Sequence, residues 1–560
     1  MQTASAGVDL IDELTKQNIA QALWMKEYRE SSIPENILAK IKSEKNSNSS
    51  FASRFKTHLR GMMNNKLSFI TSRADRYKVM QRHADVRSPQ QCYASMLFFG
   101  PESVTGYEPI PLDPKFEFPE IDAPQWKKQV GWHFFVGNLT DEHQHHYSVQ
   151  LMFWKYALLP PDLAHSLGLS DIENQVLEMH LGISDPQTQT HYRANPVIVA
   201  GTTGLIDFSP KPYSYTLGRN GIQSLDGSDN LFPVRLTARG WDMGNSPNAE
   251  IEIDLSLENA KGYFLEGQDG CCPSMDGVGT LYYSAALLKL KPQRESTITI
   301  NGNKIRLADG SMWYDHQWGT GFMPNGAPRH AVVRASQNLS QAAPGGWDWI
   351  MLQFHRNDAI SKDGEVQLAL SALHTIANES FYWQTGPTPP GTMTASFTGI
   401  YIDATNTTSY VSGVMQVIEW VKCTASPNPA VYPPTDTWYP AKYQFMVDGK
   451  IPEAIRLFTL TPIIASGQTG YFANGLQYIE GGAVITDSWG HELGRGFAEG
   501  TNYARTTAGV VTLAGLPVDR ETLTFGTAPK VSLLLKILSF VYVLFNKAEL
   551  EKILAEAKGL

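Results

Sequence analysis

Apolar and polar residues alternate along most of the middle of the chain. Tyr147–Trp154 (YSVQLMFW) and Ile251–Leu257 (IEIDLSL) carry apolar side chains at nearly every second position. This period of two is typical of β-strands with one face against a core. Asn301-Gly302 separates the alternating runs Thr297–Ile300 and Lys304–Leu307 at the spacing of a tight hairpin. The pattern predicts antiparallel β-structure.

The two ends of the chain have a different pattern. From about residue 8 to 95, apolar residues recur at helical spacing, which predicts a helical N-terminal extension. Residues 531–545 are strongly apolar with a single lysine, and they lead into a helical pattern. A membrane-spanning helix needs about 20 such residues, so we expect a helix docked on the β domains. A peripheral membrane contact through this tail is the alternative.

The chain is too long, at 560 residues, to fold around one hydrophobic core. No alternation of strands with helices appears, so β-sandwiches or β-barrels are expected. We predict an all-β fold with two β domains, residues 96–375 and 376–505. A helical extension, residues 1–95, precedes them, and a helical C-terminal tail, residues 506–560, follows.

Charge and cysteine content restrict the class of protein. Lys and Arg number 46 against 55 Asp and Glu, and no long basic run is present, so nucleic acid is not an expected partner. Four cysteines, two of them adjacent, exclude a disulfide scaffold. The N-terminus shows no secretory signal pattern. We therefore expect a cytoplasmic protein, with membrane association as the alternative.

Motifs for the common cofactors do not occur. The sequence has no Walker-type loop, no GxGxxG that opens a helix, no HExxH and no GxSxG. The histidine-rich segment 142–146 offers imidazoles, but no further ligand pattern completes a metal site. No metal and no organic cofactor are predicted.

The densest chemical signal is the segment 310–319, GSMWYDHQWG. In a strand, one face would carry Trp313, Asp315 and Gln317, and the other Tyr314, His316 and Trp318. If Asp315 faced a barrel interior lined by aromatic rings, desolvation would favour its protonated form near neutral pH. Such an acid can protonate an alkene or a hydroxyl group, and the rings can stabilise the resulting cation. The alternative is a plain structural role at a strand end.

Two further aromatic clusters stand at 131–137 (GWHFFVG) and 345–349 (GGWDW). Repeated aromatic residues suit either an apolar ligand cavity or ordinary core packing, and packing is the default interpretation.

Taken together, these motifs resemble the lipocalin-like superfamily that includes carotenoid 1,2-hydratases, AttH-type proteins, kievitone hydratase and fungal Diels–Alderases. The resemblance extends over about residues 96–505. Its marks are WHFFVG at 132–137, YSVQL at 147–151, GQDG at 267–270, YYS at 282–284, WYDHQW at 313–318, GWDW at 346–349, YP at 439–440, YIEGG at 478–482 and GRGFAEGTNY at 494–503. The sequence departs from the family pattern at Gly131, where an acidic residue is usual, and at His133, where a second aromatic is common.

The resemblance implies two consecutive lipocalin-like antiparallel β-barrels, with a ligand pocket within or between them and no cofactor. It also implies a small apolar substrate that is terpenoid, prenylated or a polyene. The aspartate that is thought to protonate an alkene in the hydratases corresponds to Asp315, with Trp313 and Tyr283 as candidate cation stabilisers. In the Diels–Alderases, the pocket chiefly folds a polyene into a reactive conformer.

We therefore expect a cofactor-independent lyase or isomerase, of the hydratase or cyclase type, that acts by protonation and conformational templating. One alternative is a pericyclase without acid catalysis, and another is a non-catalytic carrier of a lipid or pigment. The candidate catalytic residues are Asp315, His316 and Tyr283. The candidate substrate-binding residues are Trp132, Tyr282, Trp313, Tyr314, Trp318, Trp347 and Trp349.

Overall fold

The computed structural model describes most residues between 107 and 519. The larger gaps fall at 243–248, 274–278, 321–346, 374–387, 424–436 and 502–509, with shorter ones elsewhere. The predicted N-terminal helical extension and the apolar tail segment 531–545 lie outside the described residues. Within them, helical structure is limited to α6 (Pro161–Ser166) and the short 3-10 turns η3 (Glu120–Asp122) and η7 (Glu453–Ile455).

The first sheet contains 15 strands, most of them in the order β4-β3-β2-β1-β15-β13-β10-β9-β8-β7-β6. A bridge between Ala194, which follows β4, and Asp242 of β9 joins the two ends of the run from β4 to β9, so these eight strands close into a ring. The strands of this sheet are β1 (Val130–Asp141), β2 (His146–Ala157), β3 (Gln175–Asp185), β4 (Thr190–Arg193), β5 (Val197–Ala200), β6 (Ile206–Pro210), β7 (Tyr213–Leu217), β8 (Asn220–Ser224), β9 (Val234–Asp242), β10 (Ala249–Asn259), β11 (Phe264–Leu265), β12 (Cys271–Pro273), β13 (Gly279–Leu290), β14 (Thr297–Ile300) and β15 (Asn303–Thr320).

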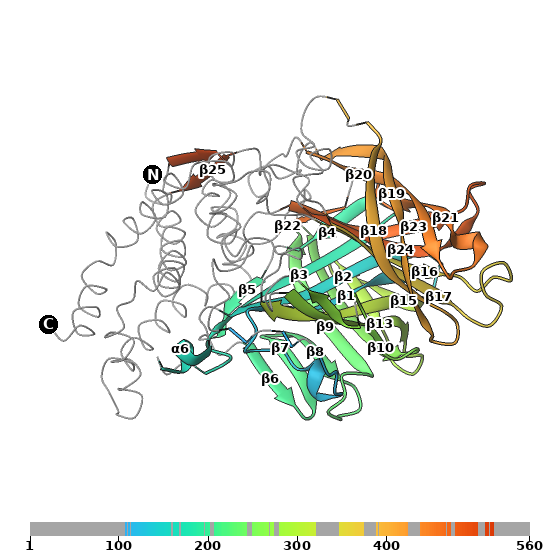
Figure 1. The fold of residues 1–560 in the computed structure, drawn as a ribbon. Coiled ribbons are helices and arrows are strands. Elements are labelled where there is room, and N and C mark those ends of the chain that lie inside the picture. The colour runs from blue at the N-terminus through green and yellow to red at the C-terminus, as the bar shows by residue number, and fades with distance from the viewer. Residues whose placement is uncertain are drawn as a thin grey trace.

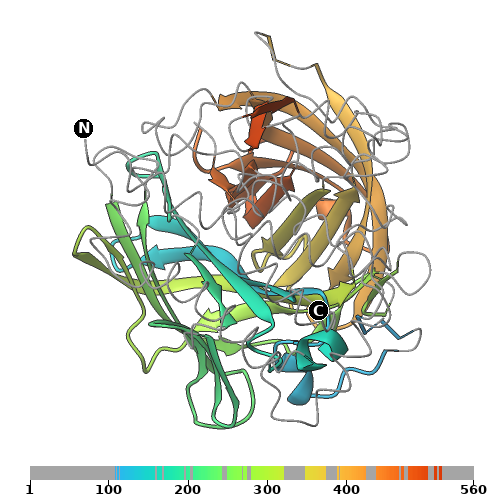
Figure 2. The ribbon, with the colours of Figure 1, turned by 90° about the vertical axis from the view of Figure 1, so that its left-hand side faces the viewer.

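The second sheet contains nine strands in the order β21-β20-β19-β18-β17-β16-β24-β23-β22. An additional pairing of β21 with β23 closes all of them except β22 into a second ring. In Figure 2, these strands, yellow to red, curl round on themselves beside the blue and green strands of the first sheet. They are β16 (Trp347–Phe354), β17 (Val366–Leu373), β18 (Met393–Ile402), β19 (Thr408–Cys423), β20 (Thr437–Gly449), β21 (Leu457–Pro462), β22 (Thr469–Tyr471), β23 (Gln477–Thr486) and β24 (Glu492–Thr501).

The expected all-β fold of two lipocalin-like barrels is confirmed. The hairpin predicted at Asn301-Gly302 is also present, with Ile300 paired to Asn303 and a positive φ at both turn residues. Figure 1 shows the two barrels side by side, with β15 and β16 next to each other where they meet.

The chain passes from the first sheet to the second before residue 375, the expected domain boundary. Both β16 and β17 pair within the second sheet, so by sheet membership the change falls between Thr320 and Trp347. Alternating hydrophobicity marks a strand without showing which sheet it joins, and this is why the sequence pattern misplaces the change. In the tail expected to be helical, β25 (Val510–Leu513) and β26 (Leu516–Asp519) form a two-stranded sheet.

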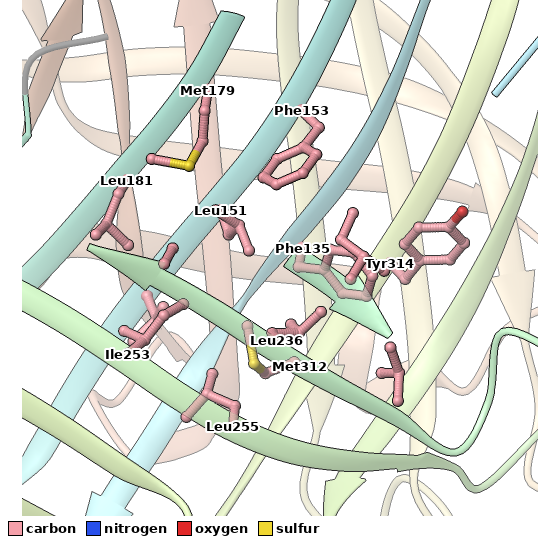
Figure 3. Packing of buried hydrophobic residues seen from close by; sticks show 14 of the residues in the cluster. Phe135, Leu151, Phe153, Met179, Leu181, Leu236, Ile253, Leu255, Met312 and Tyr314 are labelled. Atoms are coloured by element: carbon pink, nitrogen blue, oxygen red, sulfur yellow. The ribbon is translucent and has the colours of Figure 1, made fainter. Parts of the chain in front are cut away.

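The structure contains three buried hydrophobic clusters, and one of them joins the two barrels. One fills the first barrel, where side chains such as Phe135, Leu151 and Tyr314 converge (Figure 3). A second fills the other barrel. The third lies between the barrels and combines Phe134 and Trp313 of the first with residues of the second. Strands β1 and β15 are therefore buried on both faces, one toward their own interior and one toward the second barrel.

The backbone of the second barrel approaches the first barrel closely at Gly482 in β23. Its backbone N–H donates to Ser148 Oγ in β2 at 3.0 Å. A Cβ atom at this position would lie 2.5 Å from both Asn138 Oδ1 and Ser148 Cβ, which is closer than real Cβ atoms pack. A residue with a side chain would therefore push the two barrels apart.

We expect Gly482→Ala to destabilise the protein by about 1–3 kcal/mol, because an extra methyl group in a closely packed contact forces shifts of its neighbours. Gly391→Ala is the matched control, since a Cβ atom added there would meet nothing within 4 Å. Chemical denaturation of both variants measures the difference. Equal stability of the two variants would contradict the close contact.

Candidate functional site

Strand β15 presents its chemical groups to two separate environments. Trp313 and Asp315 point toward the second barrel, and Trp313 belongs to the cluster between the barrels. Tyr314 and Trp318 belong to the interior cluster of the first barrel, and His316 shares that interior. The predicted alternation is therefore confirmed. The barrel interior considered for Asp315 is not confirmed, because this residue is buried between the two barrels and not inside one of them.

Three side chains surround the Asp315 carboxyl group. Tyr282 Oη lies 2.5 Å from Oδ2, while Ser284 Oγ and Trp313 Nε1 each lie 2.5 Å from Oδ1. Trp349 of β16 donates from Nε1 to Tyr282 Oη at 3.0 Å, which ties this group to the second barrel. All five side chains are buried.

Burial raises the pKa of Asp315 from 3.8 to about 7, although hydrogen bonds from Ser284, Tyr282 and Trp313 act in the opposite direction. Desolvation dominates because both barrels exclude water from the carboxyl group. Near neutral pH, Asp315 therefore exists as a mixture of the acid and the carboxylate. A pKa near the working pH is what a general acid requires.

Ser284 links Asp315 to a second buried acid, Glu266. The Ser284 hydroxyl oxygen lies 2.5 Å from Asp315 Oδ1 and 2.9 Å from Glu266 Oε1. A hydroxyl group has one proton to donate, so both contacts are hydrogen bonds only if one of the two carboxyl groups is protonated. Burial, with the nearby Asp315, raises the pKa of Glu266 well above its usual value. We therefore assign this proton to Glu266.

An apolar surface extends sideways from Asp315 across the outer face of the first barrel. Strand register places Asp315 opposite Phe134, and Phe134 opposite Met152. In the adjacent row, the rings of Trp132 and Trp154 stack with their centroids 4.5 Å apart. Trp132 thus lies on the same face as the acid. We call Trp132, Phe134, Met152 and Trp154 the apolar floor; the last three are buried in the cluster between the barrels, and Trp132 packs against it.

The other two candidate catalytic residues, His316 and Tyr283, lie on the interior side, away from Asp315. His316 Nδ1 is 3.3 Å from Tyr283 Oη, and Tyr283 donates to Oδ1 of Asp122. The predicted trio is therefore divided by the wall of the first barrel. Tyr282, the chain neighbour of Tyr283, is the tyrosine that contacts Asp315.

The interior group depends on η3, which brings Asp122 inside the first barrel. Tyr213 Oη donates to the Asp122 backbone oxygen at 2.9 Å, and His133 Nε2 lies 3.0 Å from the same atom. Burial raises the pKa of Asp122 to about 7 and lowers that of His133 to about 4. Aromatic rings pack around this group, so these polar residues anchor η3 against the barrel wall.

The remaining aromatic candidates are distributed over both sides. Tyr282 and Trp313 contact Asp315 and Trp349 contacts Tyr282, whereas Tyr314 and Trp318 pack inside the first barrel. Trp347 begins β16, and its side chain lies outside the described residues.

Sequence reasoning missed Glu266, Asp122 and the position of Ser284. Ser284 stands within the YYS motif, and Glu266 immediately precedes the Gly267–Gly270 motif. Both residues therefore lie in or next to motifs that carry the family resemblance. No local pattern distinguishes Asp122, because only the tertiary fold brings η3 to the barrel.

The described residues contain no group of three or more His, Cys, Asp or Glu side chains arranged to hold a metal ion. Among the helices that the structure describes, none is long and apolar enough to cross a membrane.

The model of the AttH-like family matches residues 110–361, which include every strand of the first barrel. This match confirms the resemblance that the motifs indicated. No curated protein matches the chain in sequence.

Several solved structures are similar to the chain. A protein assigned as an AttH from Nitrosomonas europaea has 18% identity and a TM-score of 0.48, covering 71% of this chain and 100% of its own. Kievitone hydratase from Nectria haematococca has 13% identity and a TM-score of 0.42, covering 72% and 97%. CghA with Sch210972 has 9% identity and a TM-score of 0.31, with the same coverage.

We expect Asp315→Asn to gain stability relative to the wild type as the pH rises. The folded-state pKa of about 7 lies above the ordinary 3.8, so the wild type loses stability between about pH 4 and pH 7. Asparagine does not titrate. Between pH 5 and pH 8, the free energy of unfolding of the variant should rise by about 2–3 kcal/mol relative to that of the wild type. Urea denaturation at both pH values measures it, and a constant difference would contradict the raised pKa.

Proposed function

We propose that the protein is a cofactor-independent enzyme of the lyase or isomerase type; the match of residues 110–361 to the AttH-like family model agrees with the resemblance from which this expectation came. Its substrate is an apolar terpenoid, prenylated or polyene molecule held between the two barrels. Asp315 protonates this substrate, and the apolar floor holds it in a reactive conformation.

The observation that carries this proposal is the Asp315 carboxyl group itself. It is buried between the barrels, its pKa is raised to about 7, and three polar hydrogens point at its oxygens. A purely structural carboxylate in such a position would be expected to have a cationic partner. The groups around Asp315 are instead a phenol, a hydroxyl and an indole, which stabilise the carboxylate left after proton transfer.

The proposed step begins when protonated Asp315 gives its proton to an alkene carbon, leaving a carbocation and the Asp315 carboxylate. Indole rings such as those of Trp313 and Trp349, whose centroids are 6.3 Å apart, can stabilise that cation. In hydration, water adds to the cation and releases a proton to the carboxylate. In isomerisation, the cation loses a different proton to the same carboxylate. Both routes regenerate the acid.

Glu266 can also reload Asp315 through Ser284. The Ser284 proton passes to Asp315 while the Glu266 proton passes to Ser284, so no proton is gained or lost within the three groups. The contacts of 2.5 Å and 2.9 Å suit both transfers.

We expect Asp315→Asn to lower turnover by at least 100-fold while the protein stays folded, because general acid catalysis contributes about 10²–10⁴-fold. The assay incubates the protein with prenylated and polyene compounds without cofactor and follows mass and retention. Asp309→Asn, the same substitution at an exposed position of β15, is the control and should keep full turnover.

The products identify the reaction. A mass gain of one water indicates a hydratase, whereas a new retention time at unchanged mass indicates a cyclase or isomerase. Full turnover by Asp315→Asn would refute the acid role and favour a pericyclase that only shapes its substrate. Ligand that is bound but never converted by the wild type would favour a carrier.

We expect Ser284→Ala and Glu266→Gln each to lower turnover by about 10-fold, and the double variant to lose no more than either single one. Residues that act in one chain show such non-additive effects. The alanine also removes a hydrogen bond that lowers the pKa of Asp315, so the alkaline limb of the pH profile should move to higher pH. Additive losses, or an unmoved limb, would contradict the Ser284 link.

A further inference from the structure

A second polar group lies between the barrels, beyond the apolar floor. Tyr478 Oη of β23 is 2.7 Å from His180 Nδ1 of β3, and His180 Nε2 is 2.7 Å from Glu178 Oε1. Gln150 Nε2 also donates to Tyr478 Oη at 3.3 Å. All four side chains are buried. The two barrels therefore meet here through a phenol, an imidazole, a carboxyl and an amide.

Glu480 faces the first barrel from within this region. Alternate residues of a strand share a face, and both Tyr478 and Gly482, on either side of Glu480, contact the first barrel. Glu480 is 2% exposed, and its Oε1 has no hydrogen-bond partner among the residues that the structure describes. A buried carboxyl oxygen without a hydrogen-bond partner is unfavourable, so a ligand that supplies a donor would satisfy it.

Three carboxyl groups of the described residues act on this region. Glu499 stands opposite Glu480 in the register of β23 and β24, and Trp349 stands opposite Glu499. Glu178, Glu480 and Glu499 all act electrostatically on Tyr478. Burial and the nearby Glu499 raise the pKa of Glu480 well above its usual value. We call Glu178, His180, Tyr478, Glu480 and Glu499 the acidic end.

We propose that the acidic end binds a protonated amine on the substrate, with Glu480 as its direct partner, while the apolar body of the substrate lies on the apolar floor. A cation is favoured over a neutral donor because three carboxyl groups act at this point and because aromatic rings adjoin it. This inference deepens the proposed function and rests on it, since it takes the reacting end of the substrate to be at Asp315.

Strand register gives the approximate length of such a molecule. Asp315, Phe134, Met152 and His180 stand opposite one another on four neighbouring strands. Adjacent strands are about 4.8 Å apart, so the acid and the histidine are separated by roughly 14 Å. On the facing barrel, Glu480 and Trp349 are two strand spacings apart, about 10 Å. The substrate is therefore elongated, with an amine and a reacting double bond at opposite ends.

Amine binding has a proton balance that can be measured. The ligand arrives as an ammonium ion, and the Glu480 carboxyl group releases its proton to solvent to form the ion pair. One proton is therefore released for each amine bound. A neutral alcohol of the same chain would release none.

The test compares farnesylamine with farnesol, which share one prenyl chain and differ in the head group. Calorimetric titration of the full-length protein, in two buffers of different ionisation enthalpy, gives both affinity and proton release. We expect the amine to bind at least 10-fold more tightly and to release about one proton. Glu480→Gln should abolish both differences without changing the affinity for farnesol, whereas Glu419→Gln, at an exposed position of the second barrel, should change neither.

Equal affinity of the wild type for amine and alcohol would overturn the inference, and so would a preference that survives in Glu480→Gln. Tyr478→Phe provides a second variant if Glu480→Gln fails to fold, and it should reduce the preference for the amine by several-fold. The proposed function fails separately, through full turnover by Asp315→Asn. An amine preference without Asp315-dependent turnover would leave the acidic end as the binding site of a carrier.

Discussion

The packing of the second barrel against the outer face of the first is the contact on which the rest of the structure depends. In an isolated barrel, Asp315 and Trp313 would point into solvent, and the carboxyl group would be an ordinary surface acid. The second barrel covers this face with Trp349, Met351 and Phe497. Desolvation by this cover is the largest influence on the Asp315 pKa. The proposed chemistry is therefore a property of the pair of barrels.

Strand β15 thus serves two purposes, because its alternate side chains point to opposite faces of the sheet. Its inward side chains, Tyr314 and His316, help to fill the first barrel, around the anchored turn η3. Its outward side chains, Trp313 and Asp315, form the candidate site. Lipocalin-like barrels can hold a ligand in their interior. Here, aromatic rings and the Asp122 contacts occupy much of that interior, so the proposed substrate site lies on the outside of the barrel wall.

The sequence was sufficient for features that depend on local pattern. Alternation predicted the strands and the two faces of β15, and the Asn301-Gly302 pair predicted its hairpin. Local pattern could not show what covers each face, because the covering residues come from distant parts of the chain. This is why the sequence left open whether Asp315 faces a barrel interior, and why it indicated Tyr283 in place of Tyr282 as the catalytic tyrosine. Burial raises the pKa of Asp122, Glu266 and Glu480, with a contribution from a neighbouring carboxyl group at the last two, and only the tertiary fold creates these surroundings.

The contact at Gln353 has a consequence for how the chain folds. The strand register of β13 is irregular between Ala285 and Leu288. At this irregularity, Gln353 Nε2 of β16 donates to the backbone oxygens of Ala286 and Met312. During synthesis, β13 and β15 leave the ribosome before β16 exists. Until the second barrel arrives, water takes the place of Gln353 at these carbonyl groups, and the outer face of β1 and β15 is uncovered. The outer face of the first barrel is therefore covered only after translation of the second, and in the interval this apolar wall is the part of the chain most exposed to aggregation.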